Sequence, residues 1–443
     1  MDCRDTPGLV VSVVREGETF SRAYGKADVR NNISTSTDSI FCLASLTKAF
    51  TATLLAGLLP AEFPESRCAP APFGTLGEDI LGEEFHFVDD VRTELTTVKD
   101  LLSHRTGLIR GDLGIYGGYP ETVTRREMVH RLNHLEARFG FRDKLLYNNW
   151  MYMLAGYIAE VLSGGESWED LIVKNILGPL GMDSTVFLRD LRRYVNTTLA
   201  VPYRVVNGDF HPFPLEHYSF HPEQPAASIC STGNDMIKWM QFLLNIKSFG
   251  MTPTNLANTS AFQDTMTPHM VMETWFGFDP PLPGNPHSYG FGFGWVIGSY
   301  RGHRLVNHAG ALLASSSVLW LLPDQKTGIF VAANRQARDP VLALIAYYLA
   351  DVTSGETPWL NHTTSCTFPE PWREVQPTVD FPSKAHAPQR PLEEYTGTYG
   401  NKLFGDFRVF IRHAQSRGWK LNTGNISKGF CCRLKPKTHS RWP

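Results

Sequence analysis

Residues 41–55 have the sequence FCLASLTKAFTATLL, and they place a serine and a lysine at the start of an apolar helix. On a helix of 3.6 residues per turn, Ser45 and Lys48 lie one turn apart on the same face. The amine of Lys48 can therefore reach the hydroxyl of Ser45, which puts a nucleophile beside a base. This stretch predicts a catalytic centre that the rest of the chain supports.

The residues that follow Lys48 are apolar on nearly every side of the expected helix, from Ala49 to Leu59. A helix that is apolar all round is buried. Its polar first turn then predicts a site at the N-terminus of the helix, where free N–H groups and the helix dipole favour an oxyanion. Ser-x-x-Lys also occurs by chance, so further motifs are needed to establish this site.

A second motif, Tyr147-Asn148-Asn149, precedes another apolar run that ends at Ser163-Gly164. We expect Tyr147 and Asn149 to lie in the turn before a buried helix. A tyrosine, whose pKa is about 10, can act as a general base only where nearby cations lower that pKa. A lysine one hydrogen bond away supplies such a cation, so the motif predicts that Tyr147 and Lys48 act together.

The third motif lies in residues 304–311, RLVNHAGA, a strand-like run that contains His308-x-Gly310. A glycine in a strand lets another molecule lie close against the strand edge. We therefore expect His308, Gly310 and the following Ala311 to border the substrate.

In this order and at these separations, the three motifs resemble those of the serine β-lactamase and penicillin-binding-protein superfamily, whose signature is Ser-x-x-Lys, a second polar triplet and Lys-Thr-Gly. The Tyr-x-Asn form of the second motif resembles the class C β-lactamase and esterase or transesterase branch, which includes fungal β-lactamase-related proteins. Supporting matches extend the resemblance over roughly residues 7–350; they include PGLVVSVV at 7–14, TVKDLLSHRTGL at 97–108 and STGNDM at 231–236.

The resemblance implies an α+β fold, in which an antiparallel β-sheet is flanked by helices and joined to an all-helical subdomain. We assign residues 1–355 to this catalytic domain, the proline-rich residues 356–391 to a linker, and residues 392–443 to a partial, lipocalin-like C-terminal β segment. Residues 392–400 resemble the first strand of a small β-barrel, and we expect too few residues after it to close a barrel. The family's N-terminal helix is also expected to be absent, since six residues precede Pro7.

Local patterns predict several elements of this fold. Apolar and β-branched runs bounded by turn residues predict strands at 9–14, 19–24, 316–322 and 328–333. Helical spacing predicts a helix at 339–351.

For catalysis, the resemblance implies a two-step acyl transfer in which Ser45 attacks a carbonyl group and the acyl-enzyme is released to water or to another hydroxyl. Lys48 and Tyr147 would share the work of the general base. Asn149 would bind the acyl side of the substrate and help to hold Lys48. The N–H groups of Ser45 and Ala311 would bind the oxyanion. The reaction requires no metal and no other cofactor.

The third motif departs from the family pattern, because His308-Ala309-Gly310 replaces Lys-Thr-Gly. The threonine hydroxyl is missing, and a histidine is about neutral at pH 7. Both changes weaken the binding of a β-lactam carboxylate, so we expect a small-molecule ester, thioester or amide as substrate. Aromatic residues in the segment 201–225 agree with an apolar acyl group. Lovastatin-type transesterases of fungal secondary metabolism belong to the same branch.

Other interpretations stay open. The chain could be a non-catalytic scaffold, as in relatives that assemble into filaments, or a β-lactamase or D-amino-acid peptidase; its oligomeric state is not predicted. His211, His217 and His221 could hold a metal ion, but their spacing fits no helix face and no cysteine or carboxylate completes a known ligand set. For His104, the resemblance favours a structural role near the site over a catalytic one.

Composition limits which partners, locations and cysteine chemistry we expect. Lysine and arginine number 42 against 44 acidic residues, a net charge of −2, which does not suggest a nucleic-acid partner. We expect a soluble, cytoplasmic protein, because no run approaches the roughly 18 apolar residues of a membrane span and residues 1–5 start no apolar signal. The seven cysteines are scattered and odd in number, and they predict neither a disulfide framework nor a zinc cluster.

Overall fold

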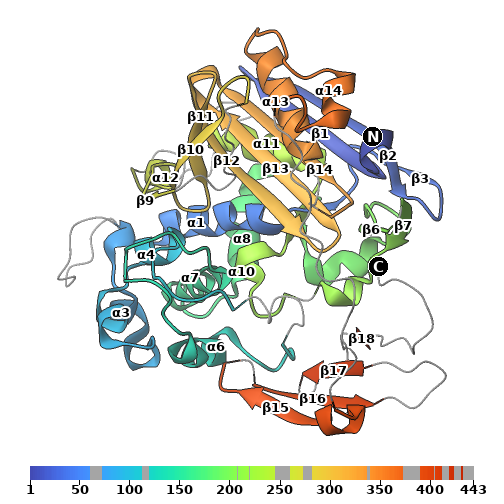
Figure 1. Ribbon diagram of the computed structural model, residues 1–443. Coiled ribbons are helices and arrows are strands. Elements are labelled where there is room, and N and C mark those ends of the chain that lie inside the picture. The colour runs from blue at the N-terminus through green and yellow to red at the C-terminus, as the bar shows by residue number, and fades with distance from the viewer. Residues whose placement is uncertain are drawn as a thin grey trace.

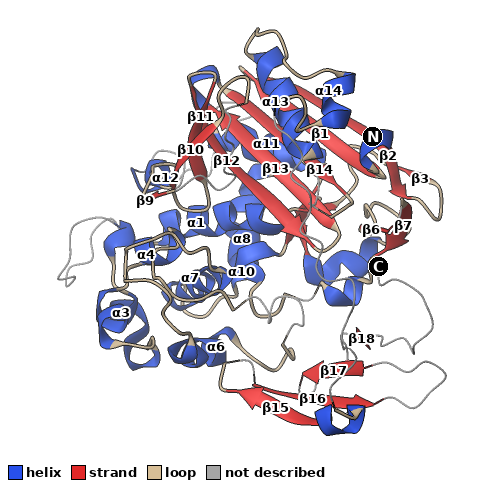
Figure 2. Ribbon diagram, in the orientation of Figure 1, coloured by secondary structure: helices blue, strands red, loops and turns tan. Residues whose placement is uncertain are grey.

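The computed structural model describes the main body of the chain and parts of its C-terminal segment. The described residues are 1–59, 72–111, 119–206, 208–218, 220–244, 260–272, 282–336, 340–372, 390–403, 405–411, 419–423 and 431–432. In the main body a large β-sheet lies between two groups of helices (Figures 1 and 2). This is the α+β arrangement that the sequence predicted.

The large sheet has nine strands in the order β3-β2-β1-β14-β13-β12-β11-β10-β9, and neighbouring strands are antiparallel. These strands are β1 (Gly8–Arg15), β2 (Glu18–Asp28), β3 (Ile33–Ser34), β9 (Met270–Val271), β10 (His287–Phe291), β11 (Val296–Tyr300), β12 (His303–Leu312), β13 (Ser315–Leu322) and β14 (Thr327–Ala333). Leu9 pairs with Ala333, so the N-terminal hairpin lies beside the last strand of the main body. All four strands predicted from local patterns are present.

The central strands are apolar on both faces. Every residue of β13 and β14 is buried, and in β1 only Arg15 is exposed. A strand with one solvated face would alternate apolar and polar residues. The continuous apolar runs of these strands therefore fit a sheet that is covered on both sides.

Helices cover both faces of the sheet. Helix α13 (Val341–Thr353), which the sequence predicted two residues earlier, lies over one face together with α14 (His362–Thr367), and α11 (Gly233–Leu243) packs on β1 and β14 from the other face (Figure 1). The remaining helices are α1 (Thr47–Leu58), α2 (Gly77–Leu81), α3 (Asp90–Leu95), α4 (Val98–Leu102), α6 (Arg125–Arg131), α7 (Asn149–Leu162), α8 (Trp168–Ile172), α9 (Gly178–Leu180), α10 (Gln224–Ala227) and α12 (Ser260–Asp264).

The two helices that carry the first two motifs form the centre of the helical part. Every residue of α1 from Thr47 to Ala56 is buried, as its all-round apolar sequence predicted. Helix α7 packs against α1. It starts where the Asn148 side chain accepts a hydrogen bond from the Trp150 N–H at 3.0 Å, and it ends beside Ser163, as expected.

The C-terminal segment contains a separate antiparallel sheet of four strands: β15 (Gly397–Asn401), β16 (Gly405–Ile411), β17 (Trp419–Thr423) and β18 (Cys431–Cys432). Figure 1 shows it below α6. The Tyr119 hydroxyl donates a hydrogen bond to the Leu403 carbonyl at 3.4 Å, which joins this segment to the main body. Smaller sheets combine β4 (Phe41–Cys42), β8 (Ile229–Ser231) and β5 (Val186–Phe187), and β6 (Tyr203–Val206) with β7 (Asp209–Pro212).

Part of the proline-rich stretch 356–391, which we assigned to a linker, has regular structure. Its first part forms α14. In the same part, Trp359 and Trp372 meet edge to face with ring centroids 4.6 Å apart. Composition alone could not predict this packing, because contacts between a few aromatic side chains stabilise it despite the many prolines in the stretch. Residues 373–389 lie outside the described part of the chain, and the domain boundaries remain predictions.

A disulfide bond joins Cys3 to Cys366, a pairing that the scattered cysteines did not predict. The neighbouring Arg4 guanidinium donates to the carbonyls of Ser365 at 2.8 Å and Phe368 at 2.9 Å. The two cysteines are 363 positions apart, a separation that carries no local signal. Disulfides persist mainly in oxidising compartments, and the cytoplasmic location that we expected from the sequence stays a prediction.

Loss of this bond should lower stability. Cys3→Ser should lose about 2 to 5 kcal/mol of unfolding free energy, because the bond closes a long loop in the unfolded chain. Urea unfolding with and without a thiol reductant measures the effect. The reductant should shift the midpoint of the wild type and leave the variant unchanged; a wild type that is insensitive to reductant and as stable as the variant would contradict the assignment.

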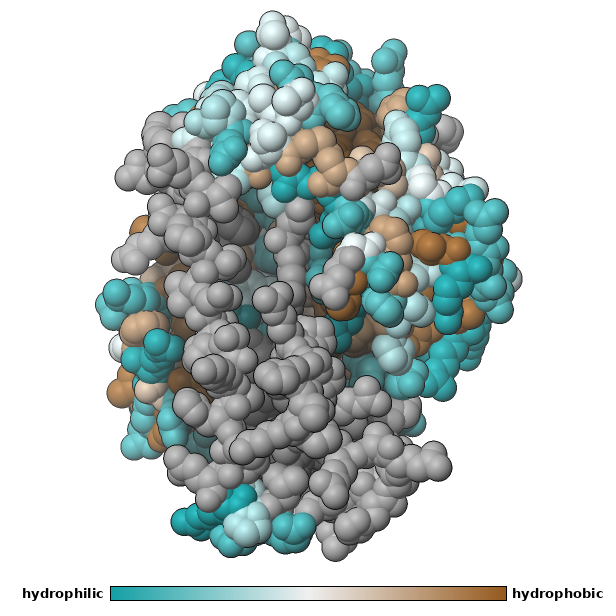
Figure 3. Space-filling model, turned by 45° about the vertical axis from the view of Figure 1, so that its right-hand side comes forward, coloured by the Kyte–Doolittle hydropathy of each residue, from teal (hydrophilic) through white to brown (hydrophobic). Residues whose placement is uncertain are grey.

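The described helices fall short of the combined length and hydropathy that a membrane span needs. Among the described residues, no helix is both long enough and apolar enough to cross a bilayer. Figure 3 shows one face of the molecule, on which hydrophilic residues make up much of the described surface and apolar residues form smaller groups between them.

Candidate active site

Ser45 lies in a 3₁₀ turn of residues 44–46 that leads directly into α1. Hydrogen bonds on both sides hold Leu43, just before this turn. The Leu43 N–H donates to the Ile229 carbonyl at 2.9 Å, and the Leu43 carbonyl accepts from the Ser317 hydroxyl at 2.7 Å. The turn that carries Ser45 is thus fixed between β8 and β13.

Two glycines allow neighbouring segments of the chain to pack closely against the backbone around Ser45 and Lys48. A Cβ at Gly310 would lie 2.0 Å from the Leu43 carbonyl oxygen and 2.3 Å from the Ser317 hydroxyl. Gly294, whose φ is +77°, would place a Cβ 2.8 Å from the carbonyl carbon of Lys48. The space at Gly310 is therefore filled by the protein's own backbone, whereas the sequence suggested that it was left for a substrate.

Lys48 is completely buried and makes three hydrogen bonds. Its ammonium group donates to Ser45 Oγ at 3.2 Å, to Asn149 Oδ1 at 2.7 Å and to the Ala226 carbonyl at 2.9 Å. Burying a charged amine is costly unless its donors are all used. The three acceptors explain how the lysine is held beside the serine, and the bond to Asn149 agrees with the expectation that this residue holds Lys48.

Tyr147, which lies two residues before α7 begins at Asn149, contacts the same serine. Its hydroxyl donates to Ser45 Oγ at 2.8 Å. The Lys48 ammonium lies 4.7 Å from the centroid of the Tyr147 ring, and the Arg110 guanidinium lies 5.6 Å from it. Two positive groups thus lie beside the Tyr147 ring. Ser45, Lys48, Tyr147 and Asn149 therefore form one cluster.

His104 supports Tyr147 from behind. Its ring centroid is 4.3 Å from that of Tyr147, and its Nδ1 accepts a hydrogen bond from the Asn148 N–H at 3.2 Å. Complete burial, and then the charge of Lys48, hold the pKa of His104 well below its ordinary value. A neutral ring that fixes the backbone of the second motif agrees with the structural role expected for His104. Nothing in the sequence showed that it lies against Tyr147.

His308 is buried beside the cluster, with its ring centroid 6.2 Å from that of Tyr147. Its Nδ1 lies 2.7 Å from the Ala309 carbonyl oxygen. Burial, and then the charge of Lys48, lower its pKa to about 3. The third motif therefore presents a neutral ring at pH 7, as the replacement of lysine by histidine suggested.

Ala311 follows on β12, where it is exposed and pairs with Ser316 of β13. Ser45 is half-buried. The role of the N–H groups of Ser45 and Ala311 as an oxyanion hole remains a prediction.

Arg125, a residue outside the three motifs, supports helix α10. Helix α10 carries the Ala226 carbonyl that binds Lys48. The Arg125 guanidinium, which is largely buried, donates to the Pro222 carbonyl at 3.1 Å and pairs with Glu169 at 2.8 Å. No local pattern predicted this support, because its residues come from separate parts of the chain.

The aromatic segment 201–225 has a different role from the one expected. Tyr203, Phe213, Tyr218 and Phe220 are all buried, and the Tyr218 hydroxyl accepts a hydrogen bond from the Ala314 N–H at 3.1 Å. These rings are core residues and do not form an open substrate-facing loop.

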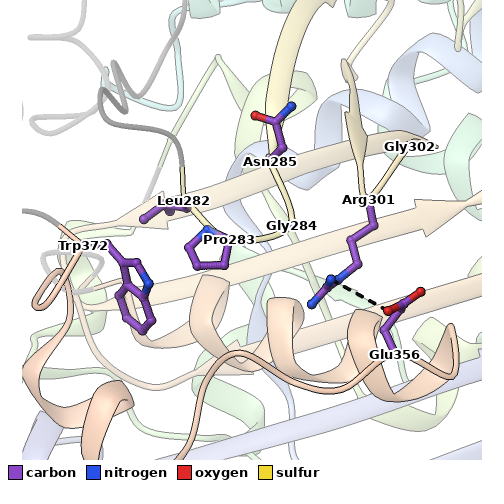
Figure 4. A pocket seen from close by; sticks show the side chains of 8 residues that line it. All are labelled: Leu282, Pro283, Gly284, Asn285, Arg301, Gly302, Glu356 and Trp372. Carbon is purple, nitrogen blue, oxygen red and sulfur yellow. Dashed lines mark ion pairs between the residues drawn. The ribbon is translucent and has the colours of Figure 1, made fainter.

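A hollow of about 620 Å³ lies away from this cluster, near α13 (Figure 4). It is lined by Leu282, Pro283, Gly284, Asn285, Arg301, Gly302, Glu356 and Trp372. Its two charged residues, Arg301 and Glu356, lie 3.8 Å apart, and Arg301 also pairs with Asp351 at 2.6 Å. It contains none of the residues of the three motifs.

An antiparallel sheet between helices, with a serine, a lysine and a tyrosine in hydrogen-bond contact, defines the class of the β-lactamases and penicillin-binding proteins. The Beta-lactamase family model matches residues 1–354, and the chain belongs to this family. It is similar to an unguisins hydrolase of Aspergillus campestris, with 26% identity over 422 residues that cover 91% of this chain and 74% of the relative. A second unguisins hydrolase, from Aspergillus violaceofuscus, is 28% identical over 338 residues, which cover 74% of this chain and 58% of the relative.

Solved structures confirm the fold. An octameric penicillin-binding protein homologue from Pyrococcus abyssi superposes with a TM-score of 0.66 at 20% identity, covering 99% of this chain and 88% of that one. SurE gives a TM-score of 0.61 at 19% identity, covering 98% and 91%. A class C β-lactamase from Rhodobacter sphaeroides gives 0.53 at 18% identity, covering 75% and 91%. At these identities the likeness concerns the fold alone.

Proposed function

We propose that this chain is a serine hydrolase that forms an acyl-enzyme at Ser45 with an ester, a thioester or an amide. The observation that carries the proposal is the pair of contacts at Ser45 Oγ, 2.8 Å to the Tyr147 hydroxyl and 3.2 Å to the Lys48 ammonium. A serine hydroxyl with an amine and a phenol in hydrogen-bond reach, each of which can act as a base in its deprotonated form, is the arrangement that covalent catalysis requires.

In the proposed reaction, the Ser45 proton passes to Tyr147 in its phenolate form, assisted by Lys48, as Oγ bonds to the substrate carbonyl carbon. The oxyanion that forms is bound by the N–H groups of Ser45 and Ala311, each contributing about 3 kcal/mol. The tetrahedral intermediate expels the alcohol, thiol or amine, which takes up the proton from Tyr147. Water then attacks the acyl-enzyme by the same steps, which releases the acid and restores Ser45.

Hydrolysis is favoured over transfer to a second hydroxyl, because two relatives are named as hydrolases. Unguisins are accordingly the first natural compounds to test. A β-lactam is disfavoured, because the pKa of His308, lowered to about 3, leaves no cation there for the carboxylate. Acyl transfer in fungal secondary metabolism is the alternative reaction for the same acyl-enzyme.

A substrate panel tests this proposal. Purified wild-type protein is incubated with a p-nitrophenyl ester, an acyl thioester, unguisins and benzylpenicillin, and products are followed by absorbance and mass spectrometry. We expect turnover of at least one ester, thioester or amide and at least about tenfold slower acylation by benzylpenicillin. No turnover of any compound, together with no adduct on Ser45, would contradict the proposal and favour a non-catalytic scaffold.

A further inference from the structure

The tautomer of His308 follows from its hydrogen bond. A carbonyl oxygen can only accept, so the 2.7 Å contact with Ala309 requires His308 Nδ1 to carry the proton. In the neutral ring the second nitrogen, Nε2, then has a lone pair and no hydrogen. The third motif thus presents a hydrogen-bond acceptor, whereas the family's lysine presents a charged donor.

This acceptor is left unused. His308 is 4% exposed, and within the part of the chain that the structure describes its Nε2 has no hydrogen-bond partner. Buried polar atoms are nearly always paired, so an orphaned acceptor at a site points to a donor that arrives with a ligand.

The side chain of His308 lies on the nucleophile's side of the sheet. Alternate residues of a strand share a face, so His308 and Gly310 point the same way, and Gly310 contacts Leu43 in front of the turn that carries Ser45. The His308 ring also lies 6.2 Å from the Tyr147 ring. The His308 ring, which carries the unused lone pair, therefore lies beside the Tyr147 ring on the side of the sheet that faces Ser45.

We infer that His308 Nε2 accepts a hydrogen bond from an N–H or O–H group of the substrate close to the scissile carbonyl. The inference rests on the proposed function and names its substrate class: acyl compounds with an amide N–H or a hydroxyl beside the bond that is broken. A carboxylate at that position would place its lone pairs against that of Nε2, so it would be rejected.

Two matched substrate pairs test this role. The p-nitrophenyl esters of N-acetylglycine and N-acetyl-N-methylglycine differ by one N–H on the acyl side. The glycyl thioesters of N-acetylcysteamine and its N-methyl analogue differ by one N–H on the leaving group. In wild type, kcat/KM for the N–H compound should exceed that of its partner by about fivefold to thirtyfold in at least one pair.

Variants at His308 test whether its side chain causes the preference for the N–H compound. His308→Leu removes the acceptor and should bring the ratio within the preferred pair close to one, whatever happens to the absolute rates. His308→Gln keeps an acceptor oxygen and should retain a several-fold preference.

The outcomes separate the two proposals. Ratios near one in both pairs with wild type, or a preference that His308→Leu does not change, would overturn the role of His308 while the acyl-enzyme stands. No acylation of Ser45 by any of the four compounds would overturn both. If His308→Leu does not fold, the wild-type ratios and His308→Gln still decide.

Discussion

Ser45→Ala should abolish turnover of every substrate that the wild type accepts, with a loss of roughly 10⁶-fold, because the atom that bonds to the substrate is gone. Lys48 and Tyr147 cannot replace it, since both are held in place to act on the Ser45 oxygen. The change deletes one oxygen atom and two hydrogen bonds of about 1 kcal/mol each, so the fold should survive.

Steady-state kinetics and thermal unfolding of the variant, measured together, check this expectation. The melting temperature should stay within a few degrees of the wild type, which shows that lost activity is not lost structure. A variant that folds and keeps more than a trace of activity would mean that another residue is the nucleophile.

Tyr147→Phe should lower kcat by roughly 10²- to 10⁴-fold, the contribution expected of a general base. Phenylalanine keeps the ring that packs against His104 and loses only the hydroxyl that contacts Ser45 at 2.8 Å. Single-turnover measurements with a p-nitrophenyl ester should show the loss already in acylation, since the proton is removed from Ser45 in that step.

Tyr152→Phe is the matched control. Tyr152 lies on α7, just after Tyr147 in the chain, and the Lys48 ammonium is 5.3 Å from its ring, but its hydroxyl donates to the Leu102 carbonyl at 2.8 Å and not to Ser45. Burial raises the pKa of Tyr152 well above its ordinary value, which keeps it a neutral phenol. A control variant that loses as much activity as Tyr147→Phe would show that the shared-base scheme is wrong.

The sequence was most informative where chemistry depends on short spacing. Ser45 and Lys48 are one helical turn apart, so their contact follows from helix geometry. That Tyr147 and Asn149 meet them depends on α7 packing against α1, and here the family resemblance supplied the link that spacing could not. The sheet followed from apolar runs such as residues 316–322 and 328–333.

What the sequence could not predict depends on contacts between distant segments. Arg125 and Ala226 hold Lys48 in place through long-range contacts. Cys3 and Cys366 meet only because the N-terminal turn lies beside α14. The environment of His308 is of the same kind, because its neutrality results from burial and from Lys48, and these exist only in the folded chain.

Intact-mass analysis of the protein after brief exposure to an acyl substrate or a fluorophosphonate tests the central claim most directly. The account predicts one added acyl or phosphonyl group, which peptide mapping places on Ser45, and no addition to Ser45→Ala under the same conditions. A folded wild type that gains no mass, or an adduct on any residue other than Ser45, would contradict it.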